Sequence, residues 1–495
     1  MKKFNLTPFI PPDKSSLIRQ FLFSLLTDDK VEVTYSENFP GDIATAYNCL
    51  PFFGKTLIKK KSKIIVAGHP KKPSTVINCE NSATVMHLLM GISLLKGWET
   101  ILTGDRSLMA RDHSDFIKAA GLYNAEIIAK DQYITLKPSK KGTSFIKTSL
   151  TRQSAQLKGF HLICMLKSGG ILRYLAKTRR NTEEILNLMG ADITDKDSTI
   201  SVAPVKKLGG YDLPSYKDPS SSFIAACAAV ITETPFTISN IYPEGLRMEP
   251  FIFMLNCGLH FPIIEKNGCF EIKSFDPITE IGEKTGISED KVPAVIDEIP
   301  FIAYMSARNG QTFSLMGGDW LKNKESDRVV QTVERIGKIY QTEQIGSGFT
   351  IVPQEKKKAA KKMPHSEDHR MEMLSALISL DKKLPFIPGD SVSVSFPLFS
   401  KMIGELTNIQ IKNRKEKILK QRKEIDKIDE KITALLSKRM DIAADIVKIK
   451  KNAGIEVFDS EREKEILKKL SLIDPSISNL VNDLYRRIFD WTKKG

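Results

Sequence analysis

The segment 102-LTGDRSLMARDHSDFIKAAGLYNAEII-128 contains an apolar strand, a charged turn, an amphipathic helix, a small residue and a second strand. The same order recurs in 175-LAKTRRNTEEILNLMGADIT-194, 238-ISNIYPEGLRMEPFIFMLNCGLHF-261 and 315-LMGGDWLKNKESDRVVQTVERIGKIYQT-342. The copies lie very roughly 70 residues apart, which is longer than the repeat of a solenoid. The repeats therefore predict compact α/β subdomains in all but the last part of the chain.

In each copy the ionic side chains fall where the helix should begin. Free backbone N–H groups and the helix dipole attract anions at that end. For any single copy, a solvent-exposed helix cap is the simpler interpretation. Because several copies share the pattern and differ in their basic residues, we expect several helix starts to face one cleft that binds a phosphorylated or carboxylated ligand.

Length and composition are typical of a globular protein with several domains. A chain of 495 residues is too long for one core, so two to four domains are expected. No apolar run approaches the roughly 20 residues that span a bilayer, and prolines interrupt 1-MKKFNLTPFIPPDKSS-16, so a cytoplasmic location is predicted. The six cysteines are scattered without CxxC spacing, which argues against a disulfide framework and a zinc site.

A net charge of +15 is compatible with nucleic acid, an anionic membrane or small anions as partners. The lysine tracts 58-IKKKSK-63 and 356-KKKAAKK-362 have the pattern of solvated loops or strand ends. No basic stripe interleaved with aromatic residues and no known nucleic-acid motif is present. We therefore predict single cations beside turns that bind small anionic substrates, and neither a nucleic-acid nor a membrane partner.

Two short motifs place cations where an anion would bind. In 11-PPDKSSLIRQFLF-23, Lys14 and Ser15 stand at a helix start, and Arg19 follows Ser15 on the same face. A capping serine with flanking cations is common, so this motif alone is weak evidence. In 324-KESDR-328, one helical turn would present both Lys324 and Arg328 to the same cleft.

Further motifs follow along the chain: 80-ENSATVMHLLMG-91, 154-SAQLKGFHL-162, 218-DPSSSFIAACAAV-230, 297-DEIPFIAYMSA-307 and 367-EDHRMEMLSAL-377. In this order, they and the two motifs above resemble the 5-enolpyruvylshikimate-3-phosphate synthase family over roughly the first 410 residues. The resemblance implies an α/β fold, a two-domain inside-out α/β barrel built from repeated βαβαββ units. Residues 1–12 with 217–408 would form one domain, residues 13–216 the other, and residues 409–495 a separate helical domain.

The implied reaction transfers the enolpyruvyl group of phosphoenolpyruvate to the 5-hydroxyl of shikimate 3-phosphate and releases phosphate, without a metal or an organic cofactor. Both substrates are anionic, which suits convergent cations. The residues that would bind shikimate 3-phosphate are Lys14, Ser15, Arg19, Ser154, Ala155, Gln156, Arg179, Asp297 and Lys324. Those that would bind phosphoenolpyruvate are Lys14, Ala83, Arg111, Gln156, Arg328 and Arg370.

Three of these matched residues would be catalytic. Asp297 would be the base on the 5-hydroxyl, Glu325 the acid and base at the methylene carbon, and Lys14 would reach both substrates. Simpler interpretations are open: Asp297 as a helix cap before Pro300, the motif at 324–328 as a solvated salt-bridge turn, and His369 as a structural hydrogen-bonding residue.

Some positions depart from the family pattern. His87 stands where the family usually has Arg, and Val394 where many members have Lys, so weaker phosphoenolpyruvate binding is predicted, by roughly 1–3 kcal/mol for each lost charge-assisted bond. Ala83 and the Ser-Ala-Gln form are similar to the class whose members are often glyphosate-tolerant. The related UDP-N-acetylglucosamine enolpyruvyl transferases usually have Asn after the first Lys and a loop Cys, whereas Ser15 and 107-SLMARD-112 stand here.

From about Leu406 the composition changes to Lys, Glu and Ile. Residues 411–495 carry 22 basic and 15 acidic side chains, so 22 − 15 = +7 of the net charge lies there. Asn408 and Asn413 predict a short connector. Helices are predicted over about 414–451, 459–472 and 476–493, the first ending at 452-NAG-454.

The first of these helices has an apolar seam with heptad spacing, formed by Ile425, Ile428, Ile432, Leu435, Ile442, Ile446 and Ile449. The same spacing puts Arg439 on the seam. An unpaired buried guanidinium costs roughly several kcal/mol. We therefore expect a bound anion to pair with Arg439.

The ungapped order Arg422, Arg439, Lys450, Asp459, Arg462 and Glu463 resembles the all-helical chorismate mutase family. The resemblance implies that these six residues bind chorismate, with Arg439 and Lys450 on its carboxylates, Glu463 on its hydroxyl and Arg422 supplied by the partner of a homodimer. Chorismate would rearrange to prephenate because the site holds a near-attack conformer.

Two observations favour an alternative for this region. In the resembled family, the third helix usually ends with Ser and, four residues later, Gln or Glu; here Thr492 matches the Ser, and the sequence stops at Gly495. This departure predicts a weak, inactive or regulatory mutase. The alternative is a non-catalytic dimerisation or effector-binding module in which Arg439 extends out of the seam along its methylenes.

Overall fold

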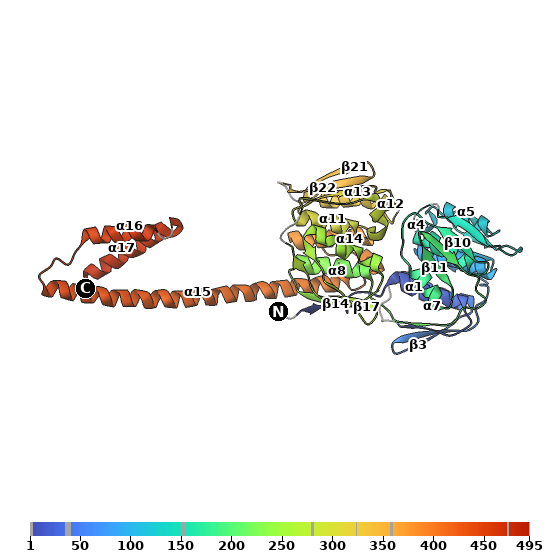
Figure 1. The fold of residues 1–495 in the computed structure, drawn as a ribbon, viewed down its shortest axis with the longest axis horizontal. Coiled ribbons are helices and arrows are strands. Elements are labelled where there is room, and N and C mark those ends of the chain that lie inside the picture. The colour runs from blue at the N-terminus through green and yellow to red at the C-terminus, as the bar shows by residue number, and fades with distance from the viewer. Residues whose placement is uncertain are drawn as a thin grey trace. The chain divides into compact units, whose positions relative to one another are not determined.

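The computed structural model describes residues 3–34, 41–150, 152, 154–278, 282–322, 324–356, 360–472 and 475–494. The chain divides into two compact units, Met1–Gln410 and Ile411–Gly495. Figure 1 labels many of the elements of both. The first unit contains helices and strands, and the second contains helices in its described residues.

One strand pattern recurs in five four-stranded sheets of the first unit. In one of them, β9 (Ile146–Ser149) runs parallel to β10 (Gly170–Arg173), and β12 (Thr199–Val202) is antiparallel to β10 and to β11 (Ile193–Lys196). Parallel neighbours need a crossover, which α6 (Ala155–Met165) supplies. With α7 (Asn181–Leu188) before β11, the order is βαβαββ, as the resemblance implied.

The other four sheets have the orders β13-β2-β4-β3, β5-β6-β8-β7, β1-β14-β17-β16 and β19-β20-β22-β21, and β15 pairs with β18. Their strands are β1 (Phe4–Asn5), β2 (Val31–Thr34), β3 (Thr56–Lys60), β4 (Lys63–Ala67), β5 (Ile77–Asn78), β6 (Thr100–Thr103), β7 (Glu126–Ala129), β8 (Ile134–Lys137), β13 (Asp212–Leu213), β14 (Phe236–Ile241), β15 (Leu259–His260), β16 (Ile263–Lys266), β17 (Cys269–Ile272), β18 (Asp276–Pro277), β19 (Lys284–Ile287), β20 (Thr312–Leu315), β21 (Tyr340–Ile345) and β22 (Gly348–Glu355).

The repeats seen in the sequence are confirmed as structural units. Each copy begins at or just after the second strand of a sheet, β6, β10, β14 or β20, and continues through helices to the next strand. The helices of these segments other than α7 are α4 (Arg106–Met109), α5 (Ser114–Leu122), α9 (Glu249–Phe253), α12 (Asp319–Lys322) and α13 (Arg328–Ile336).

The unit has two hydrophobic cores. One draws its buried side chains from residues 17–211, and the other from Leu6, Ile10 and residues 223–406. We call residues 14–213 half I, and residues 3–10 with 219–410 half II. The finer domain limits at residues 12, 216 and 408 stay predictions.

Three long helices fill each core, and each starts beside a polar residue. Half I contains α1 (Lys14–Phe23), α3 (Ala83–Lys96) and α6; half II contains α8 (Pro219–Ile231), α11 (Ile299–Arg308) and α14 (His369–Lys382), which lie side by side (Figure 1). Every residue of α8 is buried. This helix begins where it does because the Asp218 carboxylate accepts a 2.6 Å hydrogen bond from the Ser221 N–H, with Pro219 in the first turn. Two shorter helices are α2 (Gly41–Cys49) and α10 (Val292–Val295).

The two passages of the chain between the halves are tied together. The Asp218 N–H donates to the Pro11 carbonyl at 3.0 Å, and the Asp13 N–H donates to the Tyr216 carbonyl at 2.8 Å. Buried Arg247 pairs with Asp13 at 2.9 Å and with Asp218 at 3.0 Å. Burial alone would raise the pKa of Asp218, but Arg247 outweighs it and lowers the pKa to about 2.

The second unit is helical, and one expectation for it is wrong. Helix α15 runs without a break from Phe399 to Asn452, so no connector interrupts it at Asn408 and Asn413. The segment 405–452 contains no Pro or Gly, and two asparagines cost a helix only about 0.5 kcal/mol each relative to better formers. The predicted later helices are confirmed as α16 (Ser460–Ser471) and α17 (Ser478–Lys494).

The apolar seam of α15 is exposed in the single chain. Ile432 is 46% exposed and Leu435 67% exposed, and the other isoleucines of the seam are about half exposed or more. Within the described residues, no helix combines the length and the apolar character needed to cross a bilayer. The six cysteines are unpaired thiols, as predicted.

Candidate active site

Asp297 lies at the centre of a cluster of cations drawn from both halves. Arg179 of half I donates from Nη2 to Asp297 Oδ2 at 2.9 Å, and Arg328 of half II donates from Nη1 to Oδ1 at 3.0 Å. The Lys324 ammonium is 3.8 Å from the same Oδ1. Burial alone would raise the pKa of Asp297, but Lys324, Arg179 and Arg328 together hold it well below its usual range.

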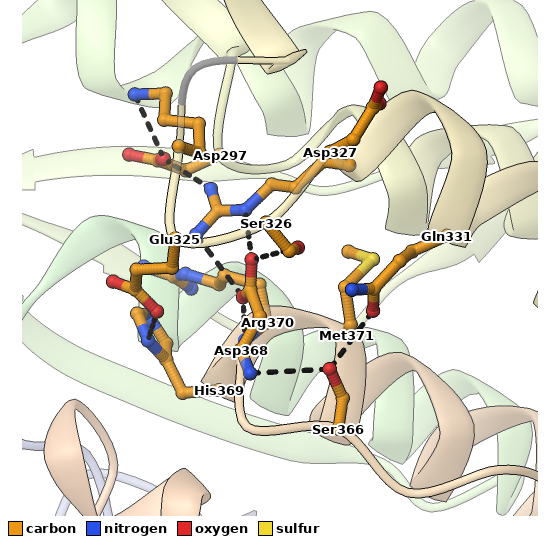
Figure 2. A network of polar contacts seen from close by, with 12 residues as sticks. Asp297, Glu325, Ser326, Asp327, Gln331, Ser366, Asp368, His369, Arg370 and Met371 are labelled. Atoms are coloured by element: carbon orange, nitrogen blue, oxygen red, sulfur yellow. Dashed lines mark hydrogen bonds and ion pairs between the residues drawn. The ribbon is translucent and has the colours of Figure 1, made fainter. Parts of the chain in front are cut away.

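A second carboxylate fixes the orientation of Arg328. Asp368 accepts from Arg328 Nε at 2.9 Å and from Nη2 at 3.3 Å, and it also accepts from the Ser326 hydroxyl at 2.8 Å. Asp368 caps α14, and Figure 2 shows it with Ser326 and Ser366 in one network. Arg328 is only 2% exposed, so its guanidinium is held by two carboxylates rather than by water.

Glu325 and His369 form a pair beside this cluster. His369 Nδ1 and Glu325 Oε2 are 2.8 Å apart, and Figure 2 shows the two side chains meeting. Burial would raise the pKa of Glu325, but the bond to His369 and nearby cations keep it below its usual range. For His369 burial has the opposite effect and lowers the pKa, although the neighbouring Glu325 opposes this shift. In the empty site the two shifts therefore favour an ionised Glu325 beside a neutral His369.

Arg370 is a buried cation with two free donors. Its side chain is 7% exposed, yet Nε and Nη1 have no hydrogen-bond partner among the described residues. Unsatisfied buried donors of a charged group are costly, about 1–3 kcal/mol or more. An anion bound beside Arg370 would satisfy them.

The α1 motif brings further cations to the same region. Lys14 pairs with Asp42 at 2.6 Å. The charges of Glu325 and Arg370, both of half II, also act on the pKa of Lys14, so these two side chains lie nearby. Burial would lower the pKa of Lys14, but Asp42 raises it, so the ammonium stays charged. Arg19 donates from Nη1 to the Ser15 carbonyl at 2.8 Å.

Gln156 is held between two side chains of α3. Its amide Nε2 donates to the Thr84 hydroxyl at 3.2 Å, and its Oε1 lies 2.6 Å from His87 Nδ1. His87 stacks on Phe116 and, at 3.3 Å, contacts His113. Burial lowers the pKa of His87 to about 3, so this ring is neutral where the resembled family usually has a charged Arg. The neighbouring Ser154 caps α6.

The remaining predicted residues make no hydrogen bond or ion pair with the Asp297 cluster among the described residues. Arg111 donates to Asn81 Oδ1 at 3.2 Å rather than to the Asp297 cluster. Ala83 is the buried first residue of α3, and Ala155 is the first residue of α6. Val394, at the position where many members of the resembled family have Lys, is 42% exposed.

One prediction about this region is wrong, and two of the simpler interpretations are excluded. Lys324 does not share a helical turn with Arg328, because α13 begins only at Arg328 behind its cap Asp327. Asp297 does not cap α11, because Glu298 stands at the cap position and both Asp297 oxygens pair with cations. Burial of Arg328 also excludes a solvated salt-bridge turn.

The partners Asp42 and Asp368 were not identified from the sequence. Asp42 is distant in the chain from Lys14, and no local pattern links them. Asp368 stands directly before His369 and Arg370 in a quoted motif, and its place as a helix cap was a usable signal.

Three side chains lie close enough together to bind one divalent cation. Ligand atoms of Glu325, Asp368 and His369 lie within 4.8 Å of one another. However, Arg328 already occupies both oxygens of Asp368, and His369 is bonded to Glu325. The donor set therefore serves an ion-pair network, and no metal site is assigned.

In the second unit, Arg439 lies against aromatic rings of its own chain. Its guanidinium carbon is 5.3 Å from the Tyr485 ring centre and 5.6 Å from that of Phe489, both on α17. Its Nη1 is buried without a hydrogen-bond partner among the described residues, so the side chain does not extend freely to solvent.

Four of the other five residues predicted to bind chorismate lie at or near the turn after α15, and the fifth, Arg422, lies far from it on the helix. Lys450 donates to the Val457 carbonyl at 3.4 Å, and Asp459 caps α16 by accepting from the Arg462 N–H at 2.9 Å. Glu463 stands in the first turn of α16, and Arg422 is exposed on α15. The Thr492 side chain and Gly495 lie outside the described part of the chain.

Comparison with protein families gives two matches. The model described as EPSP synthase (3-phosphoshikimate 1-carboxyvinyltransferase) matches residues 6–403. The model described as chorismate mutase type II matches residues 421–494.

Similar proteins agree with the first match. A 3-phosphoshikimate 1-carboxyvinyltransferase of Caldicellulosiruptor bescii is 27% identical over 430 residues, covering 80% of this chain and 96% of its own. One from Persephonella marina is 28% identical over 419 residues, covering 79% and 94%. The solved EPSP synthase of Acinetobacter baumannii has the same fold, with a TM-score of 0.67 at 22% identity over 82% of this chain and 95% of its own.

Proposed function

Because the chain belongs to the EPSP synthase family, we propose that the cluster around Asp297 is the site of enolpyruvyl transfer from phosphoenolpyruvate to the 5-hydroxyl of shikimate 3-phosphate. The observation that carries the proposal is the ion pair between Arg179 of half I and Asp297 of half II, beside a buried Arg370 with free donors. A cleft with uncompensated cations suits two anionic substrates.

Asp297 becomes a useful base only when substrates compete for its cations. In the empty site, Lys324, Arg179 and Arg328 keep the carboxylate ionised and weakly basic. Phosphate and carboxylate groups bound to these cations would weaken their pull, and burial would then raise the pKa of Asp297. The base is thus activated by the substrates whose reaction it serves.

Glu325 handles the proton at the methylene carbon of phosphoenolpyruvate. As Asp297 takes the 5-hydroxyl proton and the new carbon–oxygen bond forms, Glu325 donates a proton to the methylene. The carbon–oxygen bond to phosphate then breaks, Glu325 takes a methyl proton back so that the double bond is restored, and Asp297 gives its proton to the departing phosphate. Glu325 is ionised in the empty site, so it carries the donated proton only once bound anions offset the cations around it, with His369 at 2.8 Å as its hydrogen-bond partner.

The test is phosphate release from phosphoenolpyruvate by the purified full chain. Phosphate release that requires shikimate 3-phosphate supports the proposal. Unphosphorylated shikimate and UDP-N-acetylglucosamine should give no release. Release with UDP-N-acetylglucosamine alone would overturn it. The neutral His87 and Val394 predict a raised KM for phosphoenolpyruvate, which His87→Arg should lower.

For residues 421–494 we propose chorismate rearrangement to prephenate in a homodimer. The buried, unbonded Nη1 of Arg439 is available to a substrate carboxylate. Arg422 precedes Arg439 by 17 positions on α15, which is about 25 Å along a helix, so Arg422 of the same chain cannot complete the site. A second chain paired along the exposed seam would supply it.

Chorismate consumption by the full chain, with prephenate identified as product, tests this second function. Arg439→Ala should abolish turnover, while Arg414→Ala, an exposed change on the same helix, should not. Tight chorismate or prephenate binding without turnover would favour the effector-binding alternative. For both activities we propose a cytoplasmic location and small anionic partners.

A further inference from the structure

A buried ion pair lies next to the backbone of Arg179, and neither of its two side chains is among the predicted substrate-binding residues. The Lys158 ammonium pairs with Glu183 at 2.6 Å, and these side chains are 3% and 1% exposed. A buried pair that is cut off from water contributes little to stability on average, because desolvation offsets the attraction. Stability therefore does not explain why this pair is present next to the loop that carries Arg179.

The same ammonium also holds the backbone of that loop. Lys158 Nζ donates to the Arg179 carbonyl at 2.9 Å and to the Thr178 carbonyl at 3.4 Å. Two carbonyls thus accept from the ammonium, and Glu183 pairs with it by charge, since neither Glu183 oxygen has a hydrogen-bond partner among the described residues. Because Lys158 belongs to α6, these bonds fix the backbone on both sides of the Arg179 Cα atom to that helix.

The first turn of α7 forms a rigid support for this arrangement. Asn181, Thr182 and Glu183 are each 1% exposed. Gly159, next to Lys158, lets α6 approach this turn, since a Cβ there would lie 3.0 Å from the Thr182 hydroxyl. The same hydroxyl accepts from Arg19 Nε at 2.8 Å, so the turn supports a second predicted substrate cation.

Half II holds the other end of the loop. The Glu244 carboxylate accepts from the Arg180 N–H at 2.7 Å, and Glu244 is 4% exposed. The backbone on either side of Arg179 is therefore gripped by Lys158 from one half and Glu244 from the other. Between these two points the guanidinium reaches Asp297.

We infer that Lys158 is a positioning residue for the transfer reaction: paired with Glu183, it fixes the Arg179 carbonyl so that the guanidinium meets Asp297 and the substrate phosphate. The inference rests on the proposed function for its kinetic consequence. Its structural part, restraint of the loop at residues 178–180, holds independently of any activity.

The test compares Lys158→Met with Lys55→Met in the full chain. Lys55 is a matched control in half I, because it is also 3% exposed and its ammonium donates to two carbonyls, those of Thr27 and Gly68, at 2.8 and 2.7 Å. Both variants should lower Tm. Only Lys158→Met should raise KM for shikimate 3-phosphate, by about tenfold, with kcat changed by less than about threefold.

Epistasis with Arg179 separates positioning from a general loss of structure. On an Arg179→Ala background, Lys158→Met should change KM by less than about twofold, since the group it positions is gone. A full tenfold effect on that background, or an equal rise in KM for Lys55→Met, would overturn the inference.

Hydrogen–deuterium exchange covers the case in which the parent chain shows no transfer. Amides at residues 178–181 should exchange faster in Lys158→Met than in the parent. In Lys55→Met they should exchange at the same rate as in the parent. Equal protection in all three chains would reject the inference. An inactive parent with faster exchange only in Lys158→Met would reject the proposed function and keep the positioning role.

Discussion

Arg179 and Asp297 belong to different halves of the first unit, and their side chains meet at 2.9 Å. The contact joins a predicted substrate-binding cation to the predicted base. It therefore couples two requirements of the reaction, approach of the halves and control of the base, in one ion pair. An anionic substrate that takes Arg179 changes both together.

Asp297→Asn should stop the transfer while leaving substrate binding in place. Asparagine keeps the shape of the side chain but cannot accept the 5-hydroxyl proton, so kcat should fall by about 10²–10⁴. Phosphate release and shikimate 3-phosphate titration measure the two effects. Asp319→Asn is the control, because Asp319 is an exposed carboxylate of half II that contacts Lys322 and Ser347 and no predicted substrate residue among its described contacts. A kcat for Asp297→Asn within tenfold of the parent would exclude the assigned base.

Arg370→Met should weaken phosphoenolpyruvate binding without destabilising the empty protein. The change removes two unsatisfied donors, so the free energy of unfolding without ligand should stay equal or rise by about 1 kcal/mol, while KM for phosphoenolpyruvate rises at least about tenfold. Denaturant unfolding and initial rates give both numbers.

Arg335→Met provides the contrast to Arg370→Met. Arg335 is 2% exposed, but each of its guanidinium nitrogens donates, to Ser375, Gln331 and His365. Its loss should destabilise the protein by about 1–3 kcal/mol. If Arg370→Met is the more destabilising of the two, Arg370 has partners that an empty site should lack.

Stability should fall as pH drops below about 6.5, partly because of buried histidines in half I. Burial lowers the pKa of His161 to about 4 and that of His87 to about 3. Above about pH 6.5 neither the folded nor the unfolded state binds these protons. Below it the unfolded state takes them up first, so each histidine costs up to about 1.4 kcal/mol per pH unit until its folded pKa is reached.

The variant His161→Gln isolates this contribution, since glutamine can keep the bond to the Tyr123 hydroxyl. The difference in free energy of unfolding between about pH 7.5 and pH 5.5 should shrink by about 1 kcal/mol or more. His260→Gln, at an exposed position, should leave the difference as in the parent. An unchanged pH dependence in His161→Gln would mean that folding does not shift the pKa of His161.

Leu435→Lys should prevent dimer formation and chorismate turnover together. Leu435 is 67% exposed in the single chain, and a charge in the middle of a paired seam is costly. Light scattering should show a monomer that still releases phosphate from phosphoenolpyruvate. Ser437→Lys, on the opposite side of the same helix, should stay dimeric. A parent chain that is already monomeric would remove the basis of the prediction.

Local patterns predicted much of this structure. The strand, charged turn and helix in 102–128 follow from side-chain periodicity and capping, and they appear as β6, α4, α5 and β7. The start of α1 at Lys14 was predicted as well, although its cap is Asp13 and not a serine. These features are decided within one or two helical turns, so a single sequence contains them.

Contacts between distant residues could not be predicted in this way. Nothing in the vicinity of Lys14 indicates Asp42, and nothing near Lys158 indicates that it holds the Arg179 carbonyl. The error at Asn408 and Asn413 has a different cause. Intrinsic propensity was given too much weight there, whereas burial of Phe399, Met402 and Leu406 anchors the start of α15 in half II.

The buried Arg247, shared by Asp13 and Asp218, limits how the halves can move. Sliding the two passages of the chain past each other would strip one carboxylate from the guanidinium in a place that water does not reach. Rotation about the guanidinium keeps both bonds. The ion pair would therefore act as a pivot: any relative motion of the halves that keeps it intact is a swing about Arg247, and a swing back returns Arg179 to Asp297 without a search over orientations.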